Sequence, residues 1–215
     1  AAEAETNVKP LDTAGLVAIA SSALSTAFAQ PTKDPTPTSE VSPCTLGCSS
    51  CCYLPVNVTV PEAVHAFWAA LTAVDPTDLG NRIASASHQT RGLDGSDRLR
   101  ARVPCPLLDT DGSCTIYDAR PAYCRAYNAR SSRDACDRLI GPSRGLADPN
   151  AVVVADPAPF DAAFAAQSRI DNDLEHAGAQ SPHLDLTHAL SLLYAEPSTY
   201  KDWLQGRVDE WVRSP

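Results

Sequence analysis

The sequence predicts a mainly α-helical, compact domain with one small β-hairpin, organised around a metal centre that cysteines hold. All eight cysteines of the 215-residue chain fall between Cys44 and Cys136. Several other segments place apolar residues at helical spacing, and one Asp-Gly pair separates two short apolar runs, as in a hairpin. A chain of this length can bury about 70% of its unfolded surface, so disulfides are not needed to hold its core.

Composition and charge exclude two classes of partner. The 17 basic and 26 acidic residues give a formal charge of −9, which opposes attraction to nucleic acid phosphates and to anionic lipids. No run approaches the roughly 20 apolar residues of a membrane-spanning helix. We therefore expect no nucleic acid and no membrane partner, and we expect a cytoplasmic location.

Residues 1–43 are expected to form an N-terminal helix followed by a proline-rich linker. Residues 11–30 are apolar at helical spacing, and the four prolines of residues 31–43 forbid a regular helix. A secretion signal is the alternative, because Ala27-Phe28-Ala29 resembles a small-x-small cleavage site. The acidic residues before the helix argue against a signal and favour a helix that packs on the protein or binds a partner.

A helix is expected directly after the first cysteine group. Thr59-Val60-Pro61-Glu62 has the spacing of a capping box, in which the threonine and glutamate side chains each bond the other residue's backbone N–H. The helix should run to about Val74, since Asp75-Pro76 ends it. Capping accounts for Glu62, and a general base or metal ligand is the alternative role.

A second helix is expected from residue 77 or 78 to about Arg91, followed by a flexible loop over the sequence GLDGSD at residues 92–97. His65 and His88 lie on these two helices. Both are predicted to be surface or packing residues rather than ligands.

The stretch from Cys105 to Cys114 is predicted to be a β-hairpin. Two short apolar runs flank the Asp111-Gly112 turn signal. Asp118 can then cap a helix that tolerates Pro121 in its first turn and carries Cys124.

Beyond Cys136 the chain is expected to be irregular to about Asp161. Three amphipathic helices are predicted near residues 160–177, 184–195 and 199–212, the last capped by Ser198. The expected organisation is a helix and linker (1–43), a cysteine-cluster metal-binding domain (44–140) and a C-terminal helical extension packed on it (141–215).

The cysteines are predicted to bind metal rather than to form disulfides. Cys51 and Cys52 are adjacent, and a disulfide between neighbours strains the peptide. Thiolates suit zinc, copper(I) and iron–sulfur clusters, but not magnesium or calcium. Two adjacent thiolates fit poorly on one tetrahedral ion. Cys51 and Cys52 are therefore expected to bind different metals, or only one of them is expected to bind a metal directly while the other surrounds the ligands. The candidate ligands are Cys44, Cys48, Cys51, Cys52, Cys105, Cys114, Cys124 and Cys136.

Cysteine spacing by itself leaves several classes open. The spacing of Cys44, Cys48 and Cys51 matches the three-cysteine motif of radical S-adenosylmethionine enzymes, but Ser50 stands where those enzymes usually have an aromatic residue. The repeated strand-helix units of those enzymes are also missing. Structural zinc held by four cysteines is the other alternative, and eight cysteines divide into two such sites.

Several motifs together resemble the CxxCxxCC family of zinc- or iron-chelating domains, which includes the flagellin lysine N-methylases. The resemblance covers residues 44–136, with three residues between the first two cysteines where the family name shows two. It implies a cysteine-ligated metal centre of the iron–sulfur type, with a 4Fe-4S cluster favoured over zinc. In the methylase branch it implies methyl transfer from S-adenosylmethionine to a protein substrate. The matching motifs are the vicinal cysteine cluster, Val58–Glu62, Cys105–Leu108, Asp111–Tyr117, Arg120-Pro121 and Cys124–Tyr127.

Four further residues of this region are candidates for the site. Arg120 and Arg125 can offset thiolate charge or bind a carboxylate or phosphate, and a salt bridge to Asp118 is the alternative. Tyr117 and Tyr127 can pack over the site and exclude water, and ordinary core packing is the alternative. The cofactor-binding candidates are Arg120, Arg125 and Tyr117.

The sequence thus predicts a cysteine-ligated metal-binding protein, with an iron–sulfur centre that serves transfer or redox chemistry with S-adenosylmethionine. A structural zinc protein, or a metal carrier or sensor that acts through a partner surface, is the alternative.

Overall fold

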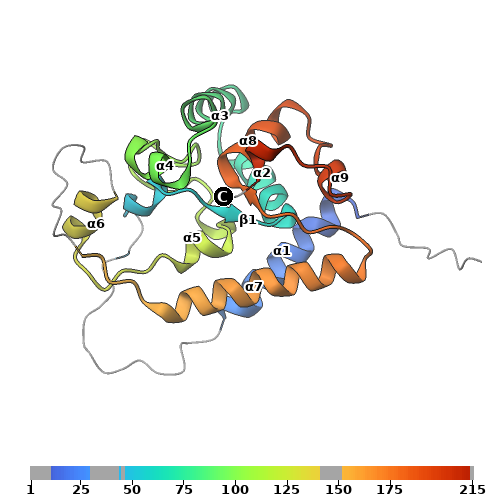
Figure 1. Ribbon diagram of the computed structural model, residues 1–215, viewed down its shortest axis with the longest axis horizontal. Helices are drawn as coiled ribbons and strands as arrows, with labels where there is room; N and C mark the ends of the chain where they lie inside the picture. Colours follow the sequence, from blue (N-terminus) through green and yellow to red (C-terminus); the bar gives the residue numbers. More distant parts are fainter. Residues whose placement is uncertain (1–10, 30–43, 45–46, 141–151, 214–215) are drawn as a thin grey trace, which may run out of the picture.

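The computed structural model describes residues 11–29, 44, 47–140 and 152–213 and is mostly helical, as predicted. Figure 1 shows the longest helix, α7 (Pro157–His176), along one side of the molecule. Helix α1 (Thr13–Phe28) lies beside it, and α2 (Val60–Ala73) contacts both α1 and α8 (Leu186–Ala195). The proline-rich linker predicted for residues 31–43 lies outside the described residues.

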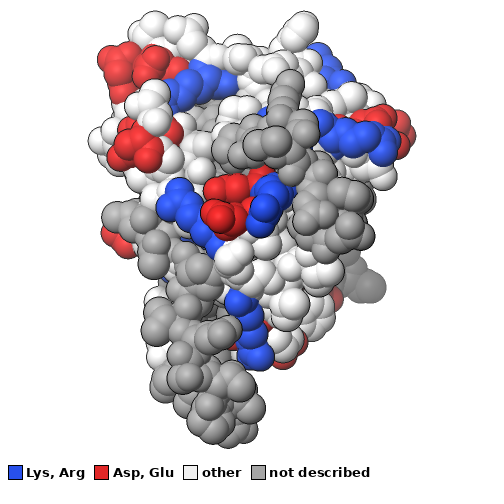
Figure 2. Space-filling view, turned by 90° about the vertical axis from the view of Figure 1, so that its left-hand side faces the viewer, with Lys and Arg blue, Asp and Glu red and all other residues white. Residues whose placement is uncertain are grey.

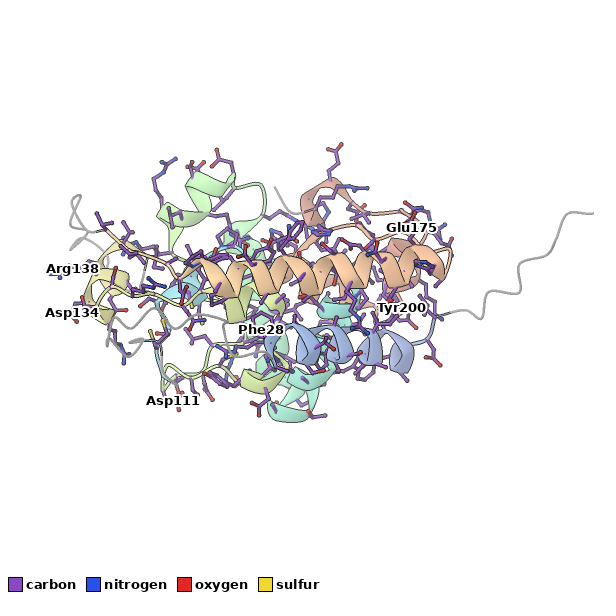
Figure 3. The ribbon with its side chains drawn as sticks, turned by 90° about the horizontal axis from the view of Figure 1, so that it is seen from below. Phe28, Asp111, Asp134, Arg138, Glu175 and Tyr200 are labelled. Carbon is purple, nitrogen blue, oxygen red and sulfur yellow. The ribbon has the colours of Figure 1, made fainter. Side chains whose placement is uncertain are left out.

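The predicted N-terminal helix is formed and packs on the protein. Asp12 caps α1 by accepting a hydrogen bond from the Gly15 N–H at 2.8 Å. Its buried face, which includes Leu16 and Leu24, packs against α2 and α7. Viewed from below, α1 and α7 run side by side, with Phe28 at the inner end of α1 and Tyr200 near its outer end (Figure 3).

The two helices predicted after the first cysteine group are both present. Thr59 and Glu62 form the expected capping box at the start of α2. Asp75 ends that helix and caps the next, α3 (Pro76–Thr90), by accepting from the backbone N–H groups of Thr77 and Asp78. Local capping signals therefore place both helices correctly.

The flexible loop predicted for residues 92–97 is only half correct, because its second half, residues 95–97, is the start of a helix. Asp94 accepts a hydrogen bond from the Asp97 N–H at 2.8 Å and caps α4 (Gly95–Ala101). Arg98 of this helix forms a buried ion pair with Asp185, with 3.3 Å between nitrogen and oxygen. The ion pair fixes a segment whose glycines and charges are typical of a loop.

The predicted hairpin is reduced to a tight turn with a single antiparallel bridge between Leu108 and Cys114. Gly112 has a φ of +83°, which glycine adopts without strain. The small two-stranded antiparallel sheet lies elsewhere and joins distant segments. Its strands are β1 (Asn57–Val58) and β2 (Leu184–Asp185).

The elements that follow the turn are short and differ in detail from those predicted. Asp118 lies inside a 3-10 turn, η2 (Tyr117–Ala119), and Pro121 occupies the N-cap of α5 (Ala122–Ala126). Asp118 is therefore not a helix cap. Cys136 lies within α6 (Arg133–Leu139).

The C-terminal part contains the first two predicted helices as α7 and α8. The third is much shorter than expected: α9 (Tyr200–Trp203) is one turn long and is followed by η3 (Glu210–Val212). Ser198 does not cap α9, whose N-cap is Thr199 without a side-chain bond. Gly206, which has a φ of +78°, stands between the two elements, and the left-handed conformation ends the helix.

The hydrophobic core has α2 at its centre. Phe67 of α2, Ile170 of α7, Leu190 of α8 and Trp203 of α9 are buried in one cluster. Leu107 and Ile116, which flank the turn between Cys105 and Cys114, belong to the same cluster. The cysteine region is thus packed directly onto the helical core. Among the described residues, no helix has the length and apolar character needed to cross a membrane.

The pairing of His183 with Asp171 predicts a pH-dependent contribution to stability. His183 Nε2 lies 3.4 Å from Asp171 Oδ2, and Nδ1 lies 3.0 Å from Asn57 Oδ1. The hydrogen bond to Asp171 raises the pKa of His183. The stabilisation is therefore full below the unfolded pKa of about 6.5 and is lost as pH rises through the raised folded pKa. Both side chains are about one third exposed, so we expect at most about 0.5 kcal/mol.

Urea unfolding of the wild type and of His183→Gln at several pH values between 5.5 and 8.5 measures this contribution. The wild-type advantage in free energy of unfolding should shrink as pH rises. A difference that stays constant over this range would contradict the assignment.

Candidate metal centre

The structure brings all eight cysteines to one region of the molecule. They come from separate segments: the loop before η1 (Ser50–Tyr53), η1 itself, the turn that follows α4, and helices α5 and α6. No disulfide bond is formed among the described residues. Thiols so far apart in sequence therefore converge through the fold and not through covalent links.

Seven of the cysteines line one cavity of about 130 Å³. Apolar side chains, including Leu107, Ile116 and Leu186, form much of the remaining wall. The predicted cofactor-binding residues Tyr117, Arg120 and Arg125 line it as well, together with Tyr127 and Asn128. The cysteines are Cys44, Cys48, Cys51, Cys52, Cys105, Cys114 and Cys124.

A smaller cavity of about 40 Å³ adjoins the first. Its cysteines are Cys44, Cys48, Cys51 and Cys136. The rest of its wall is mainly apolar and includes residues that follow α6 and precede α7. Cys136 lines only this cavity, whereas the other three cysteines line both.

Backbone hydrogen bonds hold the cysteine-bearing segments together. The Cys105 N–H donates to the Cys52 carbonyl at 2.8 Å, which joins the turn to η1. The Ala129 N–H donates to Cys44 Sγ at 3.2 Å. Such N–H donors stabilise a thiolate, so the backbone contributes to the electrostatics of the site as well as to its shape.

Helix α6 is attached to the first cysteine segment by side chains. Arg133 donates to the Gly47 carbonyl at 2.9 Å, and the Ser50 hydroxyl donates to the Asp137 carboxylate. Gly47 has a φ of +86°, so the turn between Cys44 and Cys48 uses a conformation that favours glycine. These contacts bring Cys136 to the other cysteines.

The charges around α6 alternate in sign. Figure 2 looks onto the end of the molecule that carries this helix, and basic and acidic side chains lie next to one another there. Arg133 forms an ion pair with Asp137 at 3.9 Å, and Arg102 donates to the main-chain carbonyls of Arg138 and Leu139. The described part of this face therefore presents no broad patch of one charge to a partner.

Glu62 fixes α5, and with it Cys124, to the helical core. The Ala122 N–H at the start of α5 donates to Glu62 Oε1 at 2.7 Å. Gln167 of α7 and the Thr59 N–H donate to Glu62 Oε2 at 2.9 and 2.8 Å. The side chain is buried and lines neither cavity. Glu62 is therefore a cap and a tie between elements, as its spacing predicts, rather than a ligand or general base.

Two adjacent thiols share one hydrogen bond. The bond from Cys52 lowers the pKa of Cys51 to about 7, against the effect of burial and with help from the Arg120 charge. The same bond and burial raise the pKa of Cys52. Of this pair, Cys51 is therefore the thiol that becomes a thiolate first, before metal binds.

The deeper thiols are held protonated by burial. Desolvation raises the pKa of Cys105 to about 12, partly offset by a hydrogen bond from the Leu107 N–H. It also raises the pKa of Cys114, partly offset by the Ile116 N–H, and the pKa of Cys124. A metal that binds here must therefore displace protons.

Both arginines of the larger cavity donate hydrogen bonds to main-chain carbonyls, which hold their side chains in place. Arg120 stacks on Tyr117, with 3.7 Å from the guanidinium carbon to the ring centre, and its Nε donates to the Tyr117 carbonyl at 3.0 Å. Arg125 donates to the main-chain carbonyls of Arg120 and Asp118. The alternative, a salt bridge to the Asp118 carboxylate, does not form with Arg125. Arg125 instead donates to the main-chain carbonyl oxygen of Asp118.

Some residues of the region were not singled out by the sequence. Asn128 lines both cavities and donates to the Arg125 carbonyl at 2.9 Å. Arg133 and Asp137 position α6. They carry no motif of their own, and only their spacing of four residues hints at a pair. Of the predicted histidines, His65 is half-buried on α2 with an unpartnered Nδ1, and His88 is exposed on α3. Neither lines a cavity that contains cysteines.

The donor set suits soft metals. No aspartate or glutamate among the described residues lines either cavity, so magnesium and calcium, which require oxygen ligands, do not fit. Thiolates with N–H donors around them fit zinc and iron–sulfur centres. Within the described part of the chain no three donor side chains converge closely enough to hold one ion. The sulfur atoms surround a volume instead of a point.

Residues 43–139 match the model of the CxxCxxCC family, described as a putative zinc- or iron-chelating domain. This match confirms the resemblance and supports metal binding through cysteines. It spans the segment that carries every cysteine of the chain. No curated protein and no solved structure matches the chain.

The role of Glu62 as a tie predicts a large effect of its removal. Glu62→Ala leaves the buried N–H groups of Thr59 and Ala122 without an acceptor and leaves Gln167 only the Asn57 carbonyl, so we expect a loss of about 3 kcal/mol in the free energy of unfolding. Metal content should also fall, because α5 carries Cys124. Urea unfolding and metal analysis measure the two effects.

Glu175→Ala is the matched control, since Glu175 is exposed near the C-terminal end of the same α7 that supplies Gln167 (Figure 3). If Glu62→Ala behaves like this control in stability and in metal content, the carboxylate does not hold the site.

Proposed function

We propose that this protein binds an iron–sulfur cluster in its larger cysteine-lined cavity. The observation that carries the proposal is that seven cysteines from distant segments line one cavity of about 130 Å³, with backbone N–H groups directed at their sulfur atoms. Both features are typical of sites that hold clusters on thiolates.

The spacing of the sulfur atoms favours a cluster over a single zinc ion in this cavity. Four thiolates bound to one zinc at about 2.3 Å have their sulfur atoms roughly 3.8 Å apart. A cluster contains its own bridging sulfides, so its protein ligands stand further apart. Cysteines that surround a volume without three of them converging, as the described residues do, fit the second arrangement better.

The protein supplies a positive charge and an apolar wall to such a centre. Arg120 opposes the negative charge of the thiolates nearest to it, among them Cys51, Cys114 and Cys124. Leu107, Ile116 and Leu186 provide an apolar wall, which reduces contact with water and tunes the reduction potential. When bound, the cluster supplies one-electron transfer or a Lewis-acidic iron.

The proposal includes a small-molecule ligand beside the cluster. Tyr117 is more than one third exposed and lies with Arg120 in the cavity wall. The planar donor fork of arginine can bind a carboxylate in a bidentate manner, and S-adenosylmethionine, which the family resemblance implies, carries one. Arg120 is the better candidate for this contact, because Arg125 already donates to two backbone carbonyls.

A reducing compartment suits this chemistry. Cysteine thiols in such number stay reduced where the compartment keeps disulfides from forming, and iron–sulfur clusters are held by thiolates. The cytoplasm is therefore the proposed location, and a protein is the proposed substrate class if the methylase branch of the family is the relevant one.

Purification without oxygen tests the cluster directly. We expect iron and acid-labile sulfide in similar amounts, with a broad visible absorption that disappears on oxidation. Removal of the metal should lower the melting temperature strongly, because a structural thiolate site contributes on the order of 10 kcal/mol to folding. Zinc alone, without sulfide, would support the structural zinc alternative. An unchanged melting temperature after chelation would contradict both.

The contact with the carboxylate of a ligand is tested by titrating S-adenosylmethionine into the metal-loaded protein under calorimetric observation. Arg120→Lys keeps the charge but loses the fork, so we expect at least about tenfold weaker binding, equal to about 1.4 kcal/mol. Arg100→Lys is the control, since Arg100 is exposed on α4 and paired with Asp97. Equal affinities in the wild type and both variants would contradict the role of Arg120.

A further inference from the structure

We propose that His188 is a pH-sensitive switch: protonation of its imidazole releases the C-terminal strap, residues 209–213, and loosens the wall of the larger cavity. The strap contains η3 and carries Trp211. The inference goes beyond the proposed function, because His188 lines neither cysteine cavity and the switch does not depend on which metal is bound.

His188 lies in a buried polar cluster between α8 and α3. The residue is 4% exposed, and its Nδ1 lies 3.2 Å from the Ser87 hydroxyl oxygen. Its backbone N–H donates to Asp185 Oδ1 at 3.1 Å, and the other oxygen of that carboxylate pairs with Arg98 of α4. The Asp185 carboxylate is thus already used by a helix cap and an ion pair, so it is not a free partner for an imidazolium.

Trp211 of the strap covers this cluster. The ring centres of His188 and Trp211 are 5.3 Å apart, with an angle of 76° between the ring planes. The guanidinium carbon of Arg91 lies 3.6 Å from the centre of the Trp211 ring. A cation prefers the face of an indole ring, and Arg91 already occupies such a position. A second positive charge on His188 would therefore lie close to the first.

The charged groups nearest to His188 favour its neutral form. Burial lowers the pKa of His188, and the charges of Arg98 and Arg91 add to this effect, whereas Asp185 opposes it. As pH falls below the unfolded pKa of about 6.5, the unfolded chain binds protons that the folded protein does not, so stability decreases. This sign is opposite to that of His183.

The other elements around α8 supply no further charge to the imidazole. Helix α8 itself carries no charged side chain besides His188. Helix α2, which packs on α8, has Glu62 and His65, but Glu62 bonds Gln167 and His65 interacts with the charge of Arg125. The remaining titratable side chains of α3, α4 and the strap are exposed or paired with one another.

The strap and the metal region are connected through β2. Arg213 of the strap forms an antiparallel bridge with Leu184 of β2, and β2 also pairs with β1. The Leu186 N–H donates to the Val56 carbonyl at 2.9 Å, and both residues line the larger cavity. His188 follows Leu186 by two residues. Release of the strap therefore leaves one edge of β2 unpaired, directly beside residues that form the cavity wall.

Tryptophan emission of the protein as purified tests the release of the strap. Between pH 7.5 and 5.0 we expect a shift to longer wavelength as Trp211 becomes exposed to water, with a one-proton midpoint below about 6.5. Trp211→Phe identifies the part of the signal that comes from this residue. His188→Gln cannot become charged and should show no transition. His88→Gln is the matched control, exposed on the neighbouring α3, and should behave like the wild type.

Arg91→Gln is a second variant, for the case that His188→Gln does not fold. Arg91 is exposed, so the change is tolerated by the core. Loss of its charge should move the midpoint of the emission transition to higher pH, because Arg91 opposes protonation of His188. A midpoint that stays the same or moves to lower pH would contradict the assignment.

Transfer of the bound metal to a chelator tests the connection with the cavity. At pH 5.5 the wild type should release metal several-fold faster than His188→Gln, whereas at pH 7.5 the two rates should agree. Acid also protonates the cysteine ligands, but it does so in both proteins, so the difference between them reports His188.

Two results of the emission titration overturn the inference: a wild type without a transition in this range, and a His188→Gln variant that keeps the wild-type transition. Equal rates of metal release at pH 5.5 overturn the connection with the cavity. Failure of the cluster proposal is distinguishable, because iron and sulfide would be absent while the emission titration still reports the strap.

Discussion

The buried carboxylate of Glu62 is the interaction on which the arrangement of this molecule depends most. It accepts hydrogen bonds from the start of α2, the start of α5 and the middle of α7. These elements belong to three distant parts of the chain. A buried acceptor with several donors is costly to lose, because each donor is then left without a partner. The helical core and the cysteine region thus share one polar junction.

The two regions are stabilised by different means. The helical core buries large apolar side chains such as Phe67, Leu190 and Trp203, which is the main source of stability in a domain of this size. The cysteine region has short helices, isolated bridges and cavities lined by thiols. Burial keeps most of these thiols protonated, so metal affinity depends on the removal of several protons. The shape of that region is therefore coupled to its ligand more closely than the shape of the core.

Local signals in the sequence were sufficient for much of the fold. The capping box at Thr59 and the cap at Asp75 act within a few residues, and both helices lie where these signals place them. The loop expected at residues 92–97 was wrong in its second half, where α4 begins, because Arg98 of that helix is fixed by Asp185, a partner far away in sequence. The small sheet was expected as a hairpin at residues 105–114, but it forms between β1 and β2, which are also far apart in sequence. The position of the cysteines in the sequence was enough to predict them as candidate metal ligands. Which of them share a cavity depends on how α5 and α6 pack on the rest of the protein, and this cannot be read from spacing.

The pairing of α1 with α7 has a consequence for the order in which the chain can acquire its structure during synthesis. Helix α7 follows the cysteine segments in sequence, so every cysteine leaves the ribosome before the helix that packs on α1 and α5. A core built from such distant contacts closes late. The thiols are therefore exposed to solvent, oxidants and competing metals in the nascent chain.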